Sequence, residues 1–268
     1  MSTKITKDDL KSPDQVTQTL RKGFVWTTGH SKLVITAVAV FVVVGAGLSL
    51  MGYLANKKET EQQEKYFVLE KAYTEKKRGF EEAARAETIN AQSKDKKNVP
   101  AFDPAKKASG DLQKDYGTVV AGFEAFINEA PKTKAAQMAA LNLSEIYINY
   151  KKSDEASAVL TKVEPGLSKG DVLTGLILMQ IGNVLADKGD CKAAVEKWQT
   201  LVDSKGLAFA HDEAKLRMGL CFESMNDLAK AEALYTEIAQ KEDLNTTDFA
   251  ASKEAQKYLR LLKAKKNL

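Results

Sequence analysis

The chain has 268 residues, a charged fraction of 28% and a formal net charge of +4 at pH 7. Lysine and arginine alternate with aspartate and glutamate throughout, which argues against a basic stripe for nucleic acid, so we expect no nucleic-acid partner. Residues 1–32 come first and are polar. We expect them to form a short tail with one small helix near Pro13–Gly23.

An apolar segment follows from Leu33 to Ala55, without any charged residue, His, Asn or Gln. As a helix it would be about 35 Å long, enough to cross the roughly 30 Å hydrocarbon core of a bilayer. A cleaved signal peptide is disfavoured because its apolar core is only about 7–15 residues long. A buried core helix is disfavoured because such helices are rarely apolar on all sides. We therefore expect a single transmembrane helix over residues 33–55.

Two properties of this helix stay open. Lysines lie close to both of its ends, so the positive-inside rule does not decide which side of the membrane holds the large domain. Gly45 and Ser49 lie four residues apart, a spacing compatible with helix pairing, so the oligomeric state is also left open.

Residues 56–92 have the composition of a long helix, with no proline and one glycine. Tyr66, Leu69, Tyr73 and Phe80 would form one packing stripe, and we interpret this segment as a stalk that continues from the membrane helix. Residues 93–111 contain two prolines, glycine and scattered charge, which is typical of a linker.

A helical repeat occupies residues 112–268. An alanine or valine recurs at separations of 37, 38 and 37 residues, at Val119, Ala156, Ala194 and Ala231. A second small residue lies 12 positions before the last three of these, at Ser144, Gly182 and Gly219. This pattern is typical of the tetratricopeptide repeat, a hairpin of two helices that approach closely at small residues. An irregular helical bundle is the alternative.

The pattern predicts an all-α fold in which a single transmembrane helix is followed by a tetratricopeptide-like solenoid of helical hairpins. The last residues, 249–268, would form a capping helix with a polar outer side. Because the small residues lie at helix crossings, leucine at Gly182 or Gly219 should disrupt hairpin packing.

The chain has two cysteines, Cys191 and Cys221. The repeat pattern puts the first near the start of one helix and the second late in the next, antiparallel helix. A disulfide needs Cα atoms within about 7 Å, which this arrangement permits. Two buried free thiols are the alternative. A bridge would favour an oxidising compartment such as the periplasm.

No catalytic, metal-binding or cofactor-binding motif is recognisable, so we expect no enzymatic activity, no metal and no cofactor. The two histidines, His30 and His211, lie far apart in the sequence and nothing pairs them.

A protein-binding groove is the predicted functional site, because the first helices of tetratricopeptide hairpins line a concave surface. Its positions are mostly apolar and lack the cations that would clamp a carboxyl terminus, which favours a helix or an unfolded segment as ligand. The alternative is that the capping helix or the stalk fills the groove. The predicted residues are Met138, Leu141, Glu145, Ile148, Leu176, Met179, Asn183, Leu216 and Leu220.

The order of tail, membrane helix, long charged helix and repeats, together with the stretch GFEAFINEAPKTKAAQMAALNLSEIYI at 122–148, resembles a bacterial inner-membrane family. Its members are ancillary subunits of the SecYEG translocon. The resemblance implies a cytoplasmic tail, a periplasmic repeat domain, and translocon subunits, periplasmic chaperones or exported polypeptides as partners. Two other hypotheses are a scaffold subunit of another envelope complex, for secretion, division or motility, and an enzyme built on a helical bundle.

Overall fold

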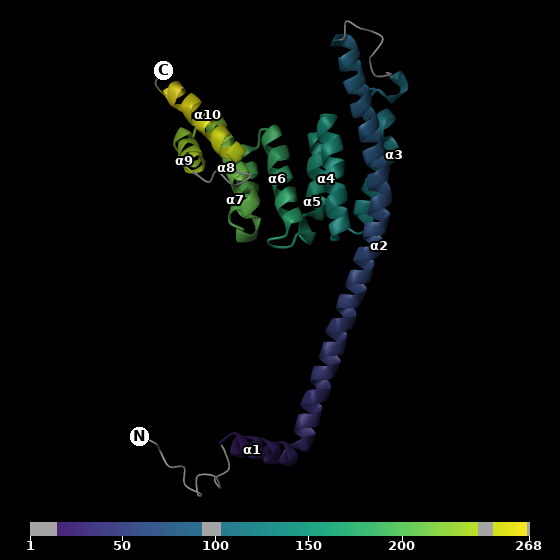
Figure 1. The fold of residues 1–268 in the computed structure, drawn as a ribbon, viewed down its shortest axis with the longest axis vertical. Coiled ribbons are helices and arrows are strands. Elements are labelled where there is room, and N and C mark those ends of the chain that lie inside the picture. Colours follow the sequence, from purple (N-terminus) through teal and green to yellow (C-terminus); the bar gives the residue numbers. More distant parts are fainter. Residues whose placement is uncertain (1–14, 93–102, 241–248, 267–268) are drawn as a thin grey trace, which may run out of the picture. The chain divides into compact units, whose positions relative to one another are not determined.

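The structure, a computed structural model, describes residues 15–92, 103–240 and 249–266, and these residues contain helices and no strand (Figure 1). They divide into two compact units, residues 1–58 and 59–268, which we describe separately. The helices are α1 (Gln15–Gly29), α2 (Ser31–Gln92), η1 (Pro104–Lys106), α3 (Leu112–Glu129), α4 (Lys134–Asn149), α5 (Ser153–Val163), η2 (Glu164–Gly166), α6 (Val172–Asp187), α7 (Cys191–Val202), η3 (Lys205–Ala210), α8 (His211–Ser224), α9 (Leu228–Ala239) and α10 (Phe249–Lys266).

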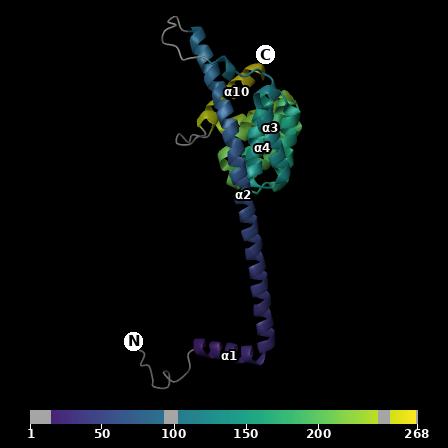
Figure 2. The same cartoon turned by 90° about the vertical axis from the view of Figure 1, so that its right-hand side faces the viewer.

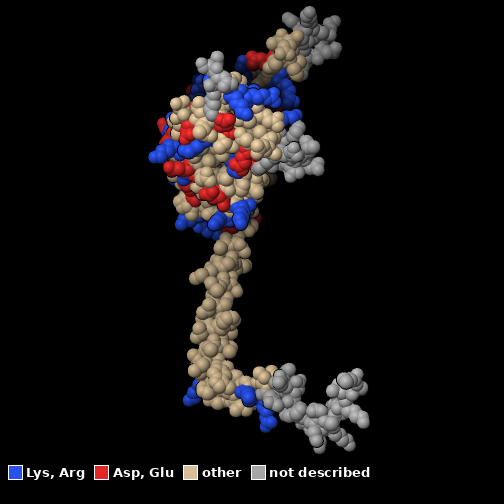
Figure 3. Space-filling model, turned by 90° about the vertical axis from the view of Figure 1, so that its left-hand side faces the viewer, with Lys and Arg blue, Asp and Glu red and all other residues tan. Residues whose placement is uncertain are grey.

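The first unit holds α1 and the beginning of α2. The small helix expected near Pro13–Gly23 is α1, which continues to Gly29, while residues 1–14 lie outside the described part. The apolar segment 33–55 lies within α2, and its side chains are exposed apart from that of Val34, which is half-buried. Figure 3 shows no charged side chain along this run. Among the described residues, α2 is the one helix long and apolar enough to cross a membrane.

The second unit begins with the charged part of α2, which packs against α3 and α4 (Figure 2). The ring of Tyr66 lies 6.5 Å from that of Phe123 and 6.3 Å from that of Phe126. The predicted stripe Tyr66, Leu69, Tyr73 and Phe80 therefore belongs to the core of the repeat domain. The segment expected to be a stalk therefore packs on the repeat domain, and the second compact unit includes it from residue 59 onward.

Three hairpins follow, α4–α5, α6–α7 and α8–α9, and α10 packs on the last of them. At the crossings of the second and third of these hairpins, glycine is required by the close approach of an aromatic side chain. A Cβ atom at Gly182 would lie 2.3 Å from Nε1 of Trp198, and one at Gly219 would lie 2.3 Å from Cε1 of Tyr235. Both aromatic side chains are buried, so the glycines make the space in which the core closes.

The turns inside these three hairpins share a backbone conformation. Lys151, Gly189 and Asn226 occupy equivalent positions, and their φ angles are +58°, +82° and +62°. Glycine adopts this left-handed region without a steric cost, asparagine tolerates it, and lysine does not. Lys151 is therefore the strained member of the set.

We expect Lys151→Gly to raise the free energy of unfolding by about 0.5–1 kcal/mol, and Gly189→Ala to lower it by about 1 kcal/mol. Urea unfolding of the full-length chain measures both changes. Asn226→Gly is the matched control and should have a smaller effect than Lys151→Gly, because asparagine already tolerates this conformation. A destabilised Lys151→Gly variant would contradict the assignment of strain.

Asp115 ties the chain before α3 to the end of α4. Its buried carboxylate accepts hydrogen bonds from the backbone N–H of Ser109 at 2.9 Å and from the hydroxyl of Tyr150 at 2.7 Å. The hydroxyl of Ser109 and the backbone N–H of Gly110 donate two more. Burial alone would raise the pKa of Asp115, but the four hydrogen bonds stabilise the charged form, and the pKa lies below its ordinary value.

We expect the repeat domain to lose this contribution in acid. Because the pKa of Asp115 is lower in the folded than in the unfolded chain, its stabilisation is fully present above the unfolded pKa of about 4, and is lost as the pH falls through the folded pKa. The difference in free energy of unfolding between the wild type and Asp115→Asn should therefore shrink below about pH 4. Urea unfolding across this range tests it, and a constant difference would contradict it.

Candidate protein-binding surface

The predicted groove residues lie on α4, α6 and α8, the first helices of their hairpins. Side-chain caps set where two of these helices begin. Thr133 accepts from the backbone N–H of Ala136 at the start of α4, and Asp171 accepts from that of Leu173 at the start of α6. Each cap satisfies a backbone donor that the first turn leaves open, and thereby fixes which residues of the helix face outward.

On α4, the predicted surface is covered by α2. The hydroxyl of Tyr73 donates to Glu145 at 2.9 Å, and the Nζ of Lys77 pairs with the same carboxylate at 2.7 Å. Asn142 donates to the hydroxyl of Tyr66 at 2.9 Å. Met138, Leu141 and Ile148 are half-buried against the same core. At the α4–α5 hairpin, the charged part of α2 therefore fills the predicted groove, as in the alternative in which the stalk occupies it.

The hydrogen bond between Tyr73 and Glu145 keeps its polarity at physiological pH. Burial first, and then the hydrogen bond to Glu145, raise the pKa of Tyr73 well above its ordinary value. The hydroxyl therefore stays protonated and donates, while Glu145 accepts from both Tyr73 and Lys77.

On α6 and α8, two of the predicted residues are more exposed than those on α4. Leu176 is 44% exposed and Leu220 is 39% exposed, while Met179 is half-buried. Asn183 is also half-buried, and its Oδ1 has no hydrogen-bond partner among the described residues.

The inclusion of Leu216 in the groove is wrong. Its side chain is 2% exposed and packs with Tyr235, Ala255 and Leu262 in the core formed by α8, α9 and α10. The repeat pattern assigned it to the surface because of its position in α8. The capping helix α10 adds the side chains that bury it.

Two exposed apolar residues beside Leu176 were not predicted. Val172 lies one turn before Leu176 on the same side of α6, and Phe209 of η3 contacts α6 at Gly175. We call Val172, Leu176 and Phe209 the α6 patch. The four-residue spacing of Val172 and Leu176 could have indicated that Val172 lies on the same surface. Phe209 lies in a connection between repeats, where the repeat pattern does not assign residues to a surface.

An aromatic pocket of about 600 Å³ opens between α2 and the end of α4. The ring of Phe80 meets that of Tyr116 edge-on at 5.3 Å, and Tyr150 meets Tyr116 edge-on at 6.0 Å. Burial and the nearby Glu145 raise the pKa of Tyr116 to about 12. The stripe on α2 signalled Phe80 as a packing residue, but not that it would line a pocket with side chains of two other helices.

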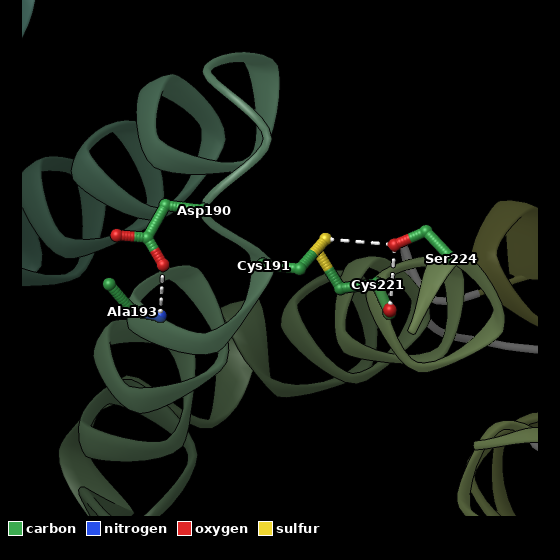
Figure 4. Close-up of a disulfide and its surroundings, with 5 residues drawn as sticks. All are labelled: Asp190, Cys191, Ala193, Cys221 and Ser224. Atoms are coloured by element: carbon green, nitrogen blue, oxygen red, sulfur yellow. Dashed lines mark hydrogen bonds between the residues drawn. A yellow bond between two sulfur atoms is a disulfide. The ribbon is translucent and has the colours of Figure 1, made fainter. Parts of the chain in front are cut away.

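Cys191 and Cys221 form a disulfide between α7 and α8, with their Cα atoms 5.2 Å apart (Figure 4). This is the bridged alternative of the two considered from the sequence. The hydroxyl of Ser224 lies 3.1 Å from the sulfur of Cys191, and Asp190 caps the start of α7 by accepting from Ala193. The bridge joins the second helix of one hairpin to the first helix of the next.

Within residues 15–92, 103–240 and 249–266 there is no group of three His, Cys, Asp or Glu side chains that could hold a metal ion. The ring nitrogens of His30 and His211 lie within hydrogen-bond distance of the backbone carbonyls of Trp26 and Ser204. The absence of enzymatic activity and of cofactors stays a prediction.

A stack of antiparallel hairpins with small residues at the crossings defines a helical-repeat protein that presents a surface rather than an enclosed site. The family model of the tetratricopeptide repeat-like domain matches residues 25–257, and the chain belongs to this family. The predicted tetratricopeptide-like all-helical fold is thereby confirmed, and domains of this type generally bind protein partners.

Two crystal structures of MamA are similar in fold. Each is 18% identical to this chain; the alignments cover 60% and 59% of this chain and 95% and 88% of the MamA chains, with TM-scores of 0.40 and 0.39. At this identity the likeness concerns the fold alone. No curated protein matches the chain.

Proposed function

We propose that the protein is a membrane-anchored scaffold whose repeat domain binds other proteins. The observation that carries the membrane part is the segment Leu33–Ala55, which is apolar on all sides and has no buried side chain. Exposure to water costs roughly 25 cal/mol per Å² of apolar surface, whereas a bilayer removes that cost. In lipid a single helix also satisfies its own backbone hydrogen bonds.

The finer proposal is an ancillary subunit of the SecYEG translocon in a bacterial inner membrane, which links export to folding. In this proposal the tail is cytoplasmic and the repeat domain periplasmic, and the partners are translocon subunits, periplasmic chaperones or exported polypeptides. The resemblance in layout and the disulfide support it, because disulfides persist in oxidising compartments. The second candidate, a scaffold of another envelope complex, has the same anchor and surface and differs only in its partner.

Compartment and redox state are tested together. The full-length chain is expressed in bacteria, spheroplasts are treated with protease, and free thiols are labelled before and after reduction. We expect the repeat domain to be digested from outside, and Cys191 and Cys221 to be labelled only after reduction. Protection of the domain, with both thiols labelled at once, would overturn the periplasmic assignment.

The partner is tested by site-specific photocrosslinking in membranes. A photoreactive residue at Leu176, in the α6 patch, should crosslink to translocon subunits, chaperones or exported chains. The same residue at Gln199, which is exposed on α7, is the matched control and should crosslink less. Crosslinks to another envelope complex would favour the second candidate. Equal crosslinking from both positions would reject the α6 patch as the binding surface.

A further inference from the structure

Helix α1 carries large apolar side chains that no described part of the chain covers. Leu20 is 69% exposed, Phe24 is 70% exposed and Trp26 is 55% exposed. A soluble helix normally buries such residues, so their exposure indicates that another phase or molecule covers them. The arrangement of charge around these side chains indicates what covers them.

The side chains of α1 separate into two arcs. At 3.6 residues per turn, Trp26, Leu20 and Phe24 fall within an arc of about 160°, together with the small or weakly polar Thr19, Gly23 and Thr27. Arg21 and Lys22 lie outside this arc, on its two flanks. Val25 is the one large apolar residue on the opposite side. An apolar arc flanked by cations, with an indole at its edge, is the pattern of a helix that lies in a membrane interface.

The charged residues of α1, and of the chain between α1 and the apolar segment, are all cations. Residues 15–32 contain Arg21, Lys22 and Lys32, and no aspartate or glutamate. Cations that flank an apolar arc suit a phospholipid, which offers an anionic phosphate next to acyl chains.

The chain also holds α1 at the level where a bilayer surface would be. Helix α1 ends at Gly29 and α2 begins at Ser31, and the backbone N–H of His30 donates to Trp26 at 3.0 Å. The apolar segment starts at Leu33, three residues after His30. If that segment spans a bilayer, α1 is kept next to the headgroups and cannot leave them by more than a few residues of chain.

We propose that α1 lies in the headgroup region of the same bilayer that α2 spans, and that it binds anionic phospholipid. The apolar arc of Leu20, Phe24 and Trp26 enters the boundary of the acyl chains, and Arg21 and Lys22 reach the phosphates. This inference rests on the proposed membrane anchor. It adds a second, lipid-dependent attachment at the tail end of that anchor.

Trp26 reports directly on this placement. The full-length chain is reconstituted into vesicles of phosphatidylcholine with phosphatidylglycerol, and its fluorescence is compared with that of Trp26→Phe. The difference isolates Trp26, because Trp198 is buried in the repeat domain and present in both. We expect blue-shifted emission that is quenched more strongly by lipids brominated near the headgroup than by lipids brominated near the end of the acyl chain. Vesicles without phosphatidylglycerol should show weaker quenching.

Two neighbouring substitutions provide the matched comparison. Phe24→Glu and Val25→Glu add the same charge at positions of similar exposure, 70% and 63%, but only Phe24 lies in the apolar arc. Phe24→Glu should abolish the quenching by brominated lipid, and Val25→Glu should retain most of it. Equal losses in both variants would overturn the proposed orientation.

The two levels of the proposal fail differently. The chain could stay with the vesicles after an alkaline wash while wild-type Trp26 is not quenched by any brominated lipid. That result would support the membrane anchor and overturn the interfacial placement of α1. A protein partner would then be the remaining explanation for the apolar arc. If the chain is released by the wash, the membrane anchor itself is wrong. Quenching that is independent of phosphatidylglycerol would overturn the preference for anionic lipid.

Discussion

Leucine in place of Gly182 or Gly219 is expected to destabilise the repeat domain by about 1–3 kcal/mol. At each position a Cβ atom alone would come within 2.3 Å of a buried aromatic ring, that of Trp198 or Tyr235. Neither ring has free space to move into, because each lies in a closed core. Either the ring leaves its position or the two helices separate, and both outcomes lose packing that the wild type has.

The matched control is Gly79→Leu. Gly79 is also helical, but a Cβ atom there would meet nothing within 4 Å. Leucine has a higher helix propensity than glycine by up to about 1 kcal/mol, so this variant should be unchanged or slightly more stable. Urea unfolding of the three full-length variants measures the contrast, with Trp198 fluorescence as a local probe for Gly182→Leu. Equal stability of Gly182→Leu and Gly79→Leu would contradict the packing seen at the crossing.

Removal of the disulfide is the second change with a large expected effect. Cys191 and Cys221 are 30 residues apart, and closing a loop of this length in the unfolded chain is worth about 3–4 kcal/mol in the chain-entropy description. The variant Cys191→Ser with Cys221→Ala should lose about this much free energy of unfolding. Alanine is chosen at position 221 because that side chain is buried, where a hydroxyl would need a new partner.

Reduction separates the bridge from the substitutions. Dithiothreitol should lower the midpoint of urea unfolding of the wild type to near that of the double variant, and should leave the double variant unchanged. Because the bridge joins α7 to α8, its loss should weaken the contact between neighbouring hairpins more than the hairpins themselves. A wild type whose stability does not respond to reductant would show that the bridge contributes nothing.

Much of the fold could be predicted from the residues alone. The recurrence of Val119, Ala156, Ala194 and Ala231 predicted the hairpins, because a helix crossing leaves room only for a small side chain, and this requirement is local. Gly182 and Gly219 were predicted to lie at crossings for the same reason, and each faces an aromatic ring there. The uncharged segment 33–55 was equally readable, since composition and length are properties of the segment itself.

The surface was less predictable, because burial depends on what a distant segment covers. The stripe on residues 56–92 indicated that this helix packs, but not that it packs on α3 and α4 and places Tyr73 and Lys77 against Glu145. Leu216 was assigned to the groove, and α10 buries it. Phe209 lies outside the repeat pattern and comes to the surface beside α6.

The sequence by itself determined the helical class, the period of the repeat and the position of the apolar segment, because each follows from neighbouring residues and their spacing. Only the tertiary structure decided that the long charged helix packs on the repeat domain, that the Cα atoms of Cys191 and Cys221 lie 5.2 Å apart, and which apolar positions remain exposed. These features depend on how helices far apart in the chain pack against one another. The spacing of residues along one helix does not show which other helix packs against it.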